Sequence, residues 1–222
     1  DEREVLAEDL LSQINEKDRI SGGSNILLYG VPGSGKSWTI EHEYVRKGVH
    51  EQRLVFHPDY TYSDFVGQIL PKVENDKLKY EFTAGPFTTL LAKAWNNPGK
   101  EYYLVIEEIN RGNAPAIFGE IFQLLDRKTE DSHRYDPSEY GESEYPITNS
   151  DIATAVFGDP EEKIRIPSNM WILATMNTAD QNVFTLDTAF QRRWKLHHMK
   201  NDVMSAGHSK TKIEGSEIEW GT

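Results

Sequence analysis

The stretch "GVPGSGKS", from Gly30 to Ser37, has the spacing G-x-x-x-x-G-K-[ST]. In this pattern the glycines let backbone N–H groups converge on phosphate oxygens, and the following helix adds the partial positive charge of its N-terminus. Lys36 is expected to reach the β- and γ-phosphates, and the Ser37 hydroxyl is expected to ligate Mg²⁺. The sequence therefore predicts a triphosphate-binding loop formed by Pro32, Gly33, Ser34, Gly35, Lys36 and Ser37.

Two carboxylates follow the apolar run of "LVIEEIN", where a parallel strand would leave its sheet beside the phosphate loop. Glu107 is expected to hold Mg²⁺, directly or through water, and Glu108 to orient and deprotonate an attacking water. Asn177 ends a second apolar run, "ILATMN", and is a candidate to hydrogen-bond the γ-phosphate or that water. Asparagine is also common in turns at strand ends, so the assignment of Asn177 depends on its neighbours Glu107 and Glu108 in the predicted site.

These side chains need a parallel sheet to bring them together. Apolar runs predict strands at 25–30, 53–57, 101–109, 169–177 and 194–199. Helical spacing and start signals predict helices at 3–17, 36–47, 62–70, 86–97, 114–128, 150–158 and 185–194, with a polar hairpin near 74–85. The alternation of strands and helices favours an α/β fold whose parallel central sheet is flanked by helices.

The chain of 222 residues suits one α/β domain. We divide it into a helix and linker at 1–24, a core at 25–200, and a polar tail at 201–222. The tail is too short and too polar for a helical lid, and the first residue is not Met, so we expect a fragment of a longer protein. Within the core, residues from about 130 to 162 are interpreted as an acidic insertion with at most one short helix, and its first part, "EDSHRYDPSEYGESEY", as a solvated, mobile loop.

Composition limits the possible functions. The formal net charge of −12 argues against broad contact between this chain and a nucleic-acid backbone. The absence of cysteine excludes disulfides and thiolate metal sites and fits a reducing cytoplasm. The sequence contains no apolar stretch long enough to span a bilayer, so we expect a cytoplasmic protein that does not contact a membrane.

The order of these motifs along the chain resembles that of the AAA+ superfamily of P-loop NTPases. Their amino-acid sequences resemble those of its McrB-like branch. The matching stretches run from about Asn25 to Trp194 and are "GVPGSGKS", "FHPDYTYSDFVGQILP", "LVIEEINRGNAPAIFGEIFQLLD", "MNTAD" and "LDTAFQRRW". This resemblance implies a hexameric, Mg²⁺-dependent, GTP-hydrolysing ring motor of a modification-dependent restriction system. It also implies an McrC-type endonuclease partner and DNA recognition through a separate domain.

The resemblance adds further candidate site residues. One of Arg192 and Arg193 is expected to reach the γ-phosphate of a neighbouring subunit, with Arg192 favoured. Base contacts are expected from the segment 18–25 and from Trp38 and Thr39, and we include Asp180 of "MNTAD" among the nucleotide-binding residues.

Two positions depart from the family pattern. Glu107 stands where the superfamily usually has aspartate, which puts the metal geometry in question. Gln181 stands where the family commonly has arginine, which puts any role of that position in doubt.

Two other functions remain open at this point. An ATP-driven remodelling or chaperone protein would use the same phosphate chemistry on a protein substrate, with ATP in place of GTP. A nucleotide-gated binding module of a defence or signalling protein would bind nucleotide without appreciable turnover. Glu107 with Glu108, and Arg192 with Arg193, favour hydrolysis over binding alone.

Overall fold

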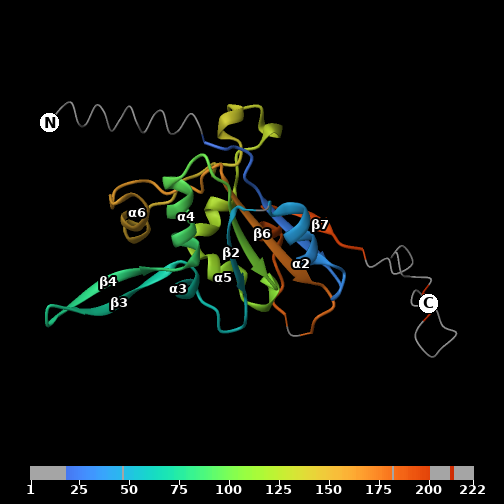
Figure 1. The fold of residues 1–222 in the computed structure, drawn as a ribbon, viewed down its shortest axis with the longest axis horizontal. Coiled ribbons are helices and arrows are strands. Elements are labelled where there is room, and N and C mark those ends of the chain that lie inside the picture. The colour runs from blue at the N-terminus through green and yellow to red at the C-terminus, as the bar shows by residue number, and fades with distance from the viewer. Residues whose placement is uncertain (1–18, 47, 182, 201–210, 213–222) are drawn as a thin grey trace.

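The computed structural model describes residues 19–46, 48–181, 183–200 and 211–212. Its centre is a five-stranded sheet in the order β2–β5–β6–β1–β7, in which each neighbouring pair is parallel (Figure 1). The strands are β1 (Asn25–Gly30), β2 (His50–Val55), β5 (Tyr102–Glu107), β6 (Met170–Asn177) and β7 (Lys195–His198). The predicted α/β class with a parallel central sheet is confirmed.

The register of the three central strands aligns their carboxyl ends. Gly30, the last residue of β1, pairs with Asn177, the last residue of β6. On the other side of β6, Ile106 pairs with Ala174, so β5 ends at Glu107 near the same edge. The predicted phosphate loop, the carboxylate pair and the asparagine therefore leave the sheet on one side.

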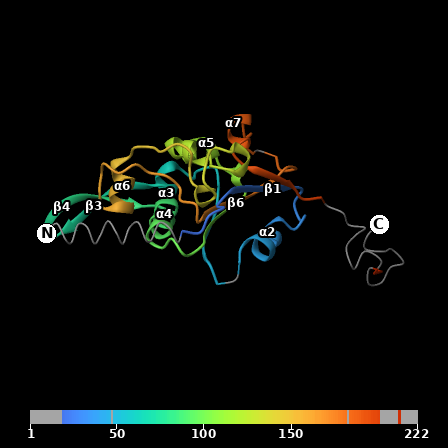
Figure 2. The same cartoon turned by 90° about the horizontal axis from the view of Figure 1, so that it is seen from above.

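Helices cover both faces of the sheet (Figure 2). On one face, α2 (Lys36–Thr39) continues as a π-helical turn through Tyr44, and Ile40 packs against the strands. The opposite face carries the larger core, formed with α3 (Tyr62–Phe65), α4 (Pro86–Asn96), α5 (Ala114–Phe118), α6 (Ser150–Phe157) and α7 (Thr188–Gln191). The predicted helix at 36–47 is thus shorter than expected and partly π-helical.

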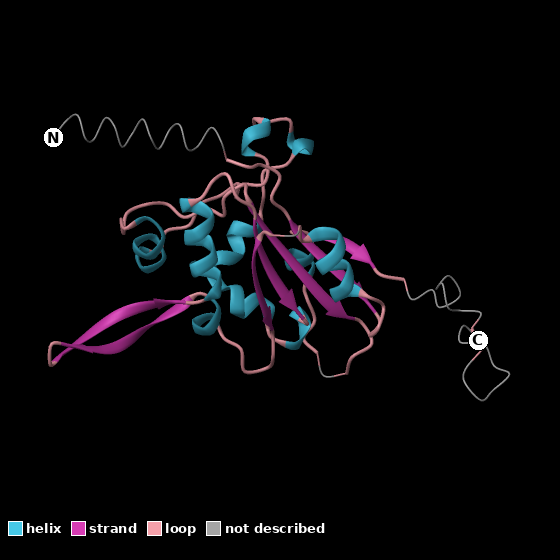
Figure 3. Ribbon diagram, in the orientation of Figure 1, coloured by secondary structure: helices cyan, strands magenta, loops and turns pink. Residues whose placement is uncertain are grey.

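A β-hairpin projects from the body between α3 and α4 (Figure 3). Its strands are β3 (Gly67–Glu74) and β4 (Lys77–Ala84), joined by a two-residue turn at Asn75 and Asp76 with positive φ values of 51° and 59°. The predicted hairpin is confirmed, but the helix predicted over 62–70 is wrong after Phe65. Gly67 has φ of 138°, which no helix contains, and Pro71 disfavours a helical conformation at Leu70, the residue before it.

The helix predicted over 114–128 is also interrupted. It ends at Phe118, and the chain continues as a 3₁₀ segment from Gly119 to Leu125. Gly119 has φ of 50°, and a Cβ atom there would lie 2.8 Å from the ring of Tyr62. The contact with α3 therefore requires a glycine at this point and changes the direction of the helix.

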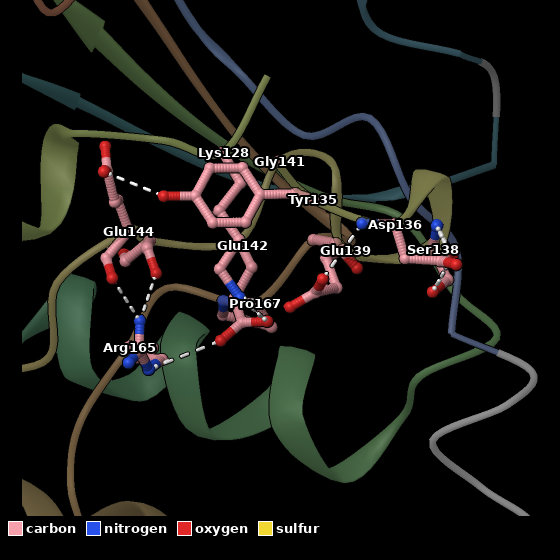
Figure 4. Close-up of polar contacts among 12 residues, drawn as sticks. Lys128, Tyr135, Asp136, Ser138, Glu139, Gly141, Glu142, Glu144, Arg165 and Pro167 are labelled. Carbon is pink, nitrogen blue, oxygen red and sulfur yellow. Dashed lines mark hydrogen bonds and ion pairs between the residues drawn. The ribbon is translucent and has the colours of Figure 1, made fainter. Parts of the chain in front are cut away.

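The acidic insertion is held by polar contacts to Lys128 and Arg165, which flank it (Figure 4). Its residues Ile147 and Ile152 are buried, and Ile147 forms a β-bridge with Ile164, just after the insertion. The Arg165 guanidinium donates to the Glu144 carbonyl oxygen at 2.7 Å, and Lys128 donates to Glu139 and Glu142. The side chains of its first part, 130–145, are mostly exposed or half-buried, whereas its second part packs into the core through Ile147 and Ile152. Its predicted helix is confirmed as α6.

The helix predicted at 3–17 and most of the tail predicted at 201–222 lie outside the described residues. Among the described residues, no helix is both long enough and apolar enough to cross a membrane.

Replacing Phe118 by Ala should lower the free energy of unfolding by about 3–5 kcal/mol, because truncating a buried phenylalanine leaves a cavity. Phe118 is fully buried, and its ring lies 5.0 Å from that of Phe65 and 5.5 Å from that of Phe190, so it joins α3, α5 and α7. Urea denaturation measures the change. Val73→Ala is the control: this side chain is 72% exposed on the hairpin, and its loss should change stability by less than about 0.5 kcal/mol. Equal effects of the two substitutions would contradict the assignment of Phe118 to the core.

Candidate active site

The phosphate loop joins β1 to α2, as the strand–loop–helix context requires. Gly33 and Gly35 have φ values of 79° and 84°. A Cβ atom at either position would meet no atom within 4 Å, so backbone conformation and not space demands glycine there. The two left-handed residues turn the chain sharply before Lys36 begins the helix.

Lys36 folds back over this loop. Its Nζ atom donates hydrogen bonds to the carbonyl oxygens of Val31 at 2.8 Å and Gly30 at 3.2 Å. Burial lowers the pKa of Lys36, while the charges of Glu108 and two more distant carboxylates act in the opposite direction. The ammonium is thus held among neutral carbonyls, at the point from which it can turn toward phosphate oxygens.

A cleft of about 380 Å³ opens beside the loop. It is lined by Pro32, Gly33, Gly35, Lys36, Ser37, Trp38, Glu108, Thr175 and Asn177. The structure therefore brings most of the predicted loop residues together with two of the predicted catalytic residues. Trp38 is 58% exposed at the rim and stacks on His42, with 4.4 Å between ring centroids. Thr39 is buried and does not line the cleft.

Glu107 lies at the base of the site, and both of its carboxylate oxygens are held. Oε2 accepts hydrogen bonds from the hydroxyls of Ser37 at 3.0 Å and Thr175 at 2.5 Å. Oε1 pairs with the guanidinium of Arg53 at 2.7 Å. Ser37 and Glu107, both expected to hold Mg²⁺, are thus joined by a direct hydrogen bond.

Glu108 has left-handed backbone angles, with φ of 56°, which turn its side chain away from the strand direction. Asn177 Nδ2 donates to Glu108 Oε1 at 2.6 Å, and Arg111 Nε lies 3.0 Å from Oε2. Asp180 joins this network through Arg111, at 3.2 Å, and through Asn177 Nδ2, which donates to it at 3.4 Å. The strand end after β5 and the strand end after β6 are linked by these contacts.

Three residues of the site were missed from the sequence. Thr175 is a polar residue inside the apolar run of β6, which is a weak sequence signal. Arg53 lies on the edge strand β2, and its contact with Glu107 depends on a strand order that the sequence alone does not specify. Arg111 follows the carboxylate pair by three residues, and its role depends on the left-handed turn at Glu108.

Arg192 and Arg193 lie near the amino-terminal ends of the strands, whereas the phosphate loop follows the carboxyl-terminal end of β1. The Arg193 carbonyl oxygen accepts a hydrogen bond from Asn25, the first residue of β1, whereas the loop follows the last. The six residues of β1 span about 20 Å. Neither arginine can therefore contact a nucleotide bound at the loop of its own chain.

The two arginines differ in their contacts. The Arg193 guanidinium pairs with Asp126 at 2.7 Å and lies 4.0 Å from the centroid of the Phe122 ring. Arg192 is exposed at the rim of a cleft of about 480 Å³, and its guanidinium makes no hydrogen bond or ion pair with the described residues.

The segment 18–25 was expected to contact the nucleotide base. Its described residues, 19–25, instead contact other parts of the chain. Arg19 donates to the carbonyl oxygen of Ala94 at 3.1 Å, and Gly23 N–H donates to the carbonyl oxygen of Ser168 at 2.7 Å. Both contacts lie near the start of β1, away from the cleft beside the phosphate loop. The sequence argument assumed that closeness along the chain meant closeness in space, and β1 separates the two ends.

Residues 25–194 match the family model of the AAA domain, dynein-related subfamily. The chain belongs to this AAA family. The match spans four strands of the sheet, β1, β2, β5 and β6, together with the phosphate loop, the carboxylate pair and the arginines, so the AAA+ fold expected from the motifs is confirmed.

Two curated relatives of this AAA domain are components of restriction enzymes. The type II restriction enzyme BsuMI component YdiS of Bacillus subtilis is 40% identical over 206 residues, covering 79% of this chain and 57% of that protein. The EcoKMcrB subunit of a type IV methyl-directed restriction enzyme from Escherichia coli is 29% identical over 181 residues, covering 79% of this chain and 35% of that protein. The chain thus spans about half or less of the length of these relatives, and its resemblance to McrB-like AAA+ proteins is confirmed.

A solved structure from Cytophaga hutchinsonii, described as a candidate ATPase, is 18% identical with a TM-score of 0.46. The structural alignment covers 87% of the present chain and 46% of the Cytophaga hutchinsonii chain.

Replacing Lys36 by Ala should weaken nucleotide binding by the AAA domain, because the side chain supplies the cation nearest the phosphates. Replacing Glu108 by Gln should leave nucleotide affinity close to that of the wild type while slowing hydrolysis by about 10²–10⁴-fold, the usual contribution of a general base. Calorimetry gives the affinities, and phosphate release gives the rates. An equal loss of affinity in both variants would assign Glu108 to metal binding or to structure.

Proposed function

We propose that the chain is the nucleoside triphosphate-hydrolysing motor domain of a restriction system, with GTP as its nucleotide. The observation that carries this proposal is the convergence of Lys36, Ser37, Glu107, Glu108 and Asn177 at one edge of the sheet. A binding module needs the loop alone, whereas this site also has a metal-side carboxylate and a separate carboxylate placed to take a proton.

The donor set beside the loop fits Mg²⁺. The Ser37 hydroxyl and the Glu107 carboxylate are both oxygen ligands, and their oxygens lie 3.0 Å apart. Mg²⁺ takes few protein ligands and keeps water and phosphate oxygens around it, so it does not require a dense cluster of side chains. This agrees with the described part of the chain, where no group of three or more His, Cys, Asp or Glu side chains has metal-binding geometry. When bound, Mg²⁺ neutralises charge on the phosphate oxygens.

In this proposal the protein itself handles the proton. Glu108 accepts the proton of the attacking water, and the Asn177 amide orients that water or the γ-phosphate. Asn177 donates a hydrogen bond to Oε1 of Glu108, whereas Oε2 lies 3.0 Å from Arg111 Nε but accepts no hydrogen bond from the described residues. In this proposal Oε2 is therefore the oxygen that accepts the proton.

The proposal of GTP rests on the resemblance of the motif sequences to those of McrB-like proteins. A phosphate loop contacts phosphates and metal, so it does not distinguish the bases. The relatives support a restriction system. By the same resemblance we propose an McrC-type endonuclease partner, DNA recognition through a separate domain, a homo-hexamer and a cytoplasmic location.

We further propose that Arg192 acts in trans on the nucleotide of a neighbouring copy. Its position at the edge away from its own loop, its exposure, and its lack of partners among the described residues support this role. A guanidinium is planar and permanently charged, which suits the charge on a transferring phosphoryl group. Arg193 is expected to have a structural role, because Asp126 already neutralises it.

The nucleotide assignment is tested by measuring GTP and ATP turnover side by side with the full-length protein, with and without its endonuclease partner. We expect faster turnover of GTP and stimulation by the partner. Calorimetry on this domain provides an independent measurement. Tight binding of ATP together with no binding of GTP would contradict the restriction-motor proposal and favour a remodelling ATPase.

The trans role is tested by mixing two inactive chains. Arg192→Ala keeps an intact phosphate loop, and Lys36→Ala keeps an intact Arg192, so a mixture should recover part of the turnover because each chain supplies what the other lacks. A supplied arginine is worth about 10³–10⁵ in rate where it has been measured. Arg193→Ala is the matched control: it keeps both Lys36 and Arg192, so it should retain turnover by itself and gain none on mixing with Lys36→Ala. Turnover that is independent of protein concentration, with no recovery when Arg192→Ala is mixed with Lys36→Ala, would contradict the trans role.

A further inference from the structure

The carboxylate of Glu107 is held from both neighbouring strands of β5. Arg53, on β2, contacts Oε1 at 2.7 Å, and Thr175, on β6, donates its hydroxyl to Oε2 at 2.5 Å. The Glu107 side chain is 13% exposed and the whole of Thr175 is 2% exposed. No motif assigns a function to Arg53 or Thr175.

This arrangement answers a problem of side-chain length. Glu107 has one more methylene group, and one more rotatable bond, than the aspartate usual at this position in the superfamily. A free glutamate would lose that extra rotamer freedom each time it held a metal. Anchors on both oxygens remove the freedom in advance, which is the general advantage of a preorganised ligand.

The Thr175 hydroxyl has a second function, because a hydroxyl both donates and accepts. While its proton points to Glu107, its oxygen accepts the backbone N–H of Glu108 at 3.0 Å. That N–H belongs to the residue with left-handed backbone angles, whose conformation directs the Glu108 side chain toward Asn177. A single buried hydroxyl thus orients the side chain of one carboxylate and the backbone of the next.

We infer that Thr175 and Arg53 are positioning residues that adapt the metal-side position to a glutamate, and that Thr175 also couples the metal carboxylate to the catalytic one. The inference rests on the proposed function, because it assumes a magnesium–nucleotide complex at the loop. The two residues touch neither nucleotide nor metal in this account and act through Glu107 and Glu108.

The first test compares Thr175→Val with Thr175→Ser. Valine keeps the branched shape and removes the hydroxyl, whereas serine keeps the hydroxyl. The readout is the Mg²⁺ concentration at half-maximal binding of a fluorescent, non-hydrolysable GTP analogue. We expect Thr175→Val to raise this concentration about 10–100-fold, the usual effect of losing a partner of a metal ligand. Thr175→Ser should restore most of the loss, and binding of the analogue in EDTA should be the same in all three proteins.

The second test separates positioning from general damage with a double-mutant cycle. The shorter side chain of Glu107→Asp cannot reach Thr175 or Arg53 in the same way, so Thr175→Val should change the Mg²⁺ midpoint much less in that background. Thr175→Val should still slow hydrolysis there, because the Glu108 N–H loses its acceptor in either background.

Arg53→Gln provides a second cycle that does not depend on the folding of a core variant, since the Arg53 side chain is 35% exposed on an edge strand. The positive charge of Arg53 repels a metal to the same extent whether residue 107 is glutamate or aspartate. The positioning effect is therefore measured by how much more Arg53→Gln changes the Mg²⁺ midpoint with Glu107 than in the Glu107→Asp background. We expect its removal to raise the Mg²⁺ midpoint at least about threefold more with Glu107 than with aspartate at this position.

The outcomes separate this inference from the proposed function. Equal shifts of the Mg²⁺ midpoint in both backgrounds, or a Thr175→Ser variant as impaired as Thr175→Val, would overturn the positioning roles and leave the proposed function standing. Analogue binding by the wild-type protein that does not depend on Mg²⁺ would overturn both.

Discussion

Parallel, in-register pairing of β1, β6 and β5 is the constraint on which the rest of the structure depends. Because the three strands run in the same direction and end together, whatever follows each of them in the sequence meets at one edge. The phosphate loop, the carboxylate pair and Asn177 are 70 to 150 residues apart along the chain, yet they line or adjoin one cleft. The strands are buried and apolar, so their pairing resists slippage that would move these residues apart.

The charged side chains of the site are paired with one another or hydrogen-bonded to backbone carbonyls. Lys36 lies against backbone carbonyls, Glu107 pairs with Arg53, and Glu108 pairs with Arg111. Binding a triphosphate and a cation must therefore exchange existing contacts for new ones. This exchange makes the strand ends responsive to the nucleotide, because the partners lie on β2, β6 and the turn after β5.

Elements whose local signals agree with their packing were predictable from the sequence. The strands, α4, α6 and the phosphate loop follow directly from apolar runs, caps and glycines. The sequence analysis was wrong where tertiary contacts override a local pattern. Gly67 ends an expected helix and begins a strand, and Gly119 bends a helix around a tyrosine ring. Arg53 and Thr175 could not be identified because their importance depends on strand order and register, which are non-local properties.

The separation of Arg192 from the phosphate loop by the full length of β1 has a consequence for assembly. A subunit that offers an arginine at one edge of its sheet and needs one at the other is directional. Under the trans role proposed for Arg192, copies of the subunit would associate head to tail, each donating its arginine to one neighbour and receiving one from the other. An open row of this kind always has one terminal site without a donor and one terminal arginine without a recipient. Only closure of the row into a circle gives every site an identical set of groups.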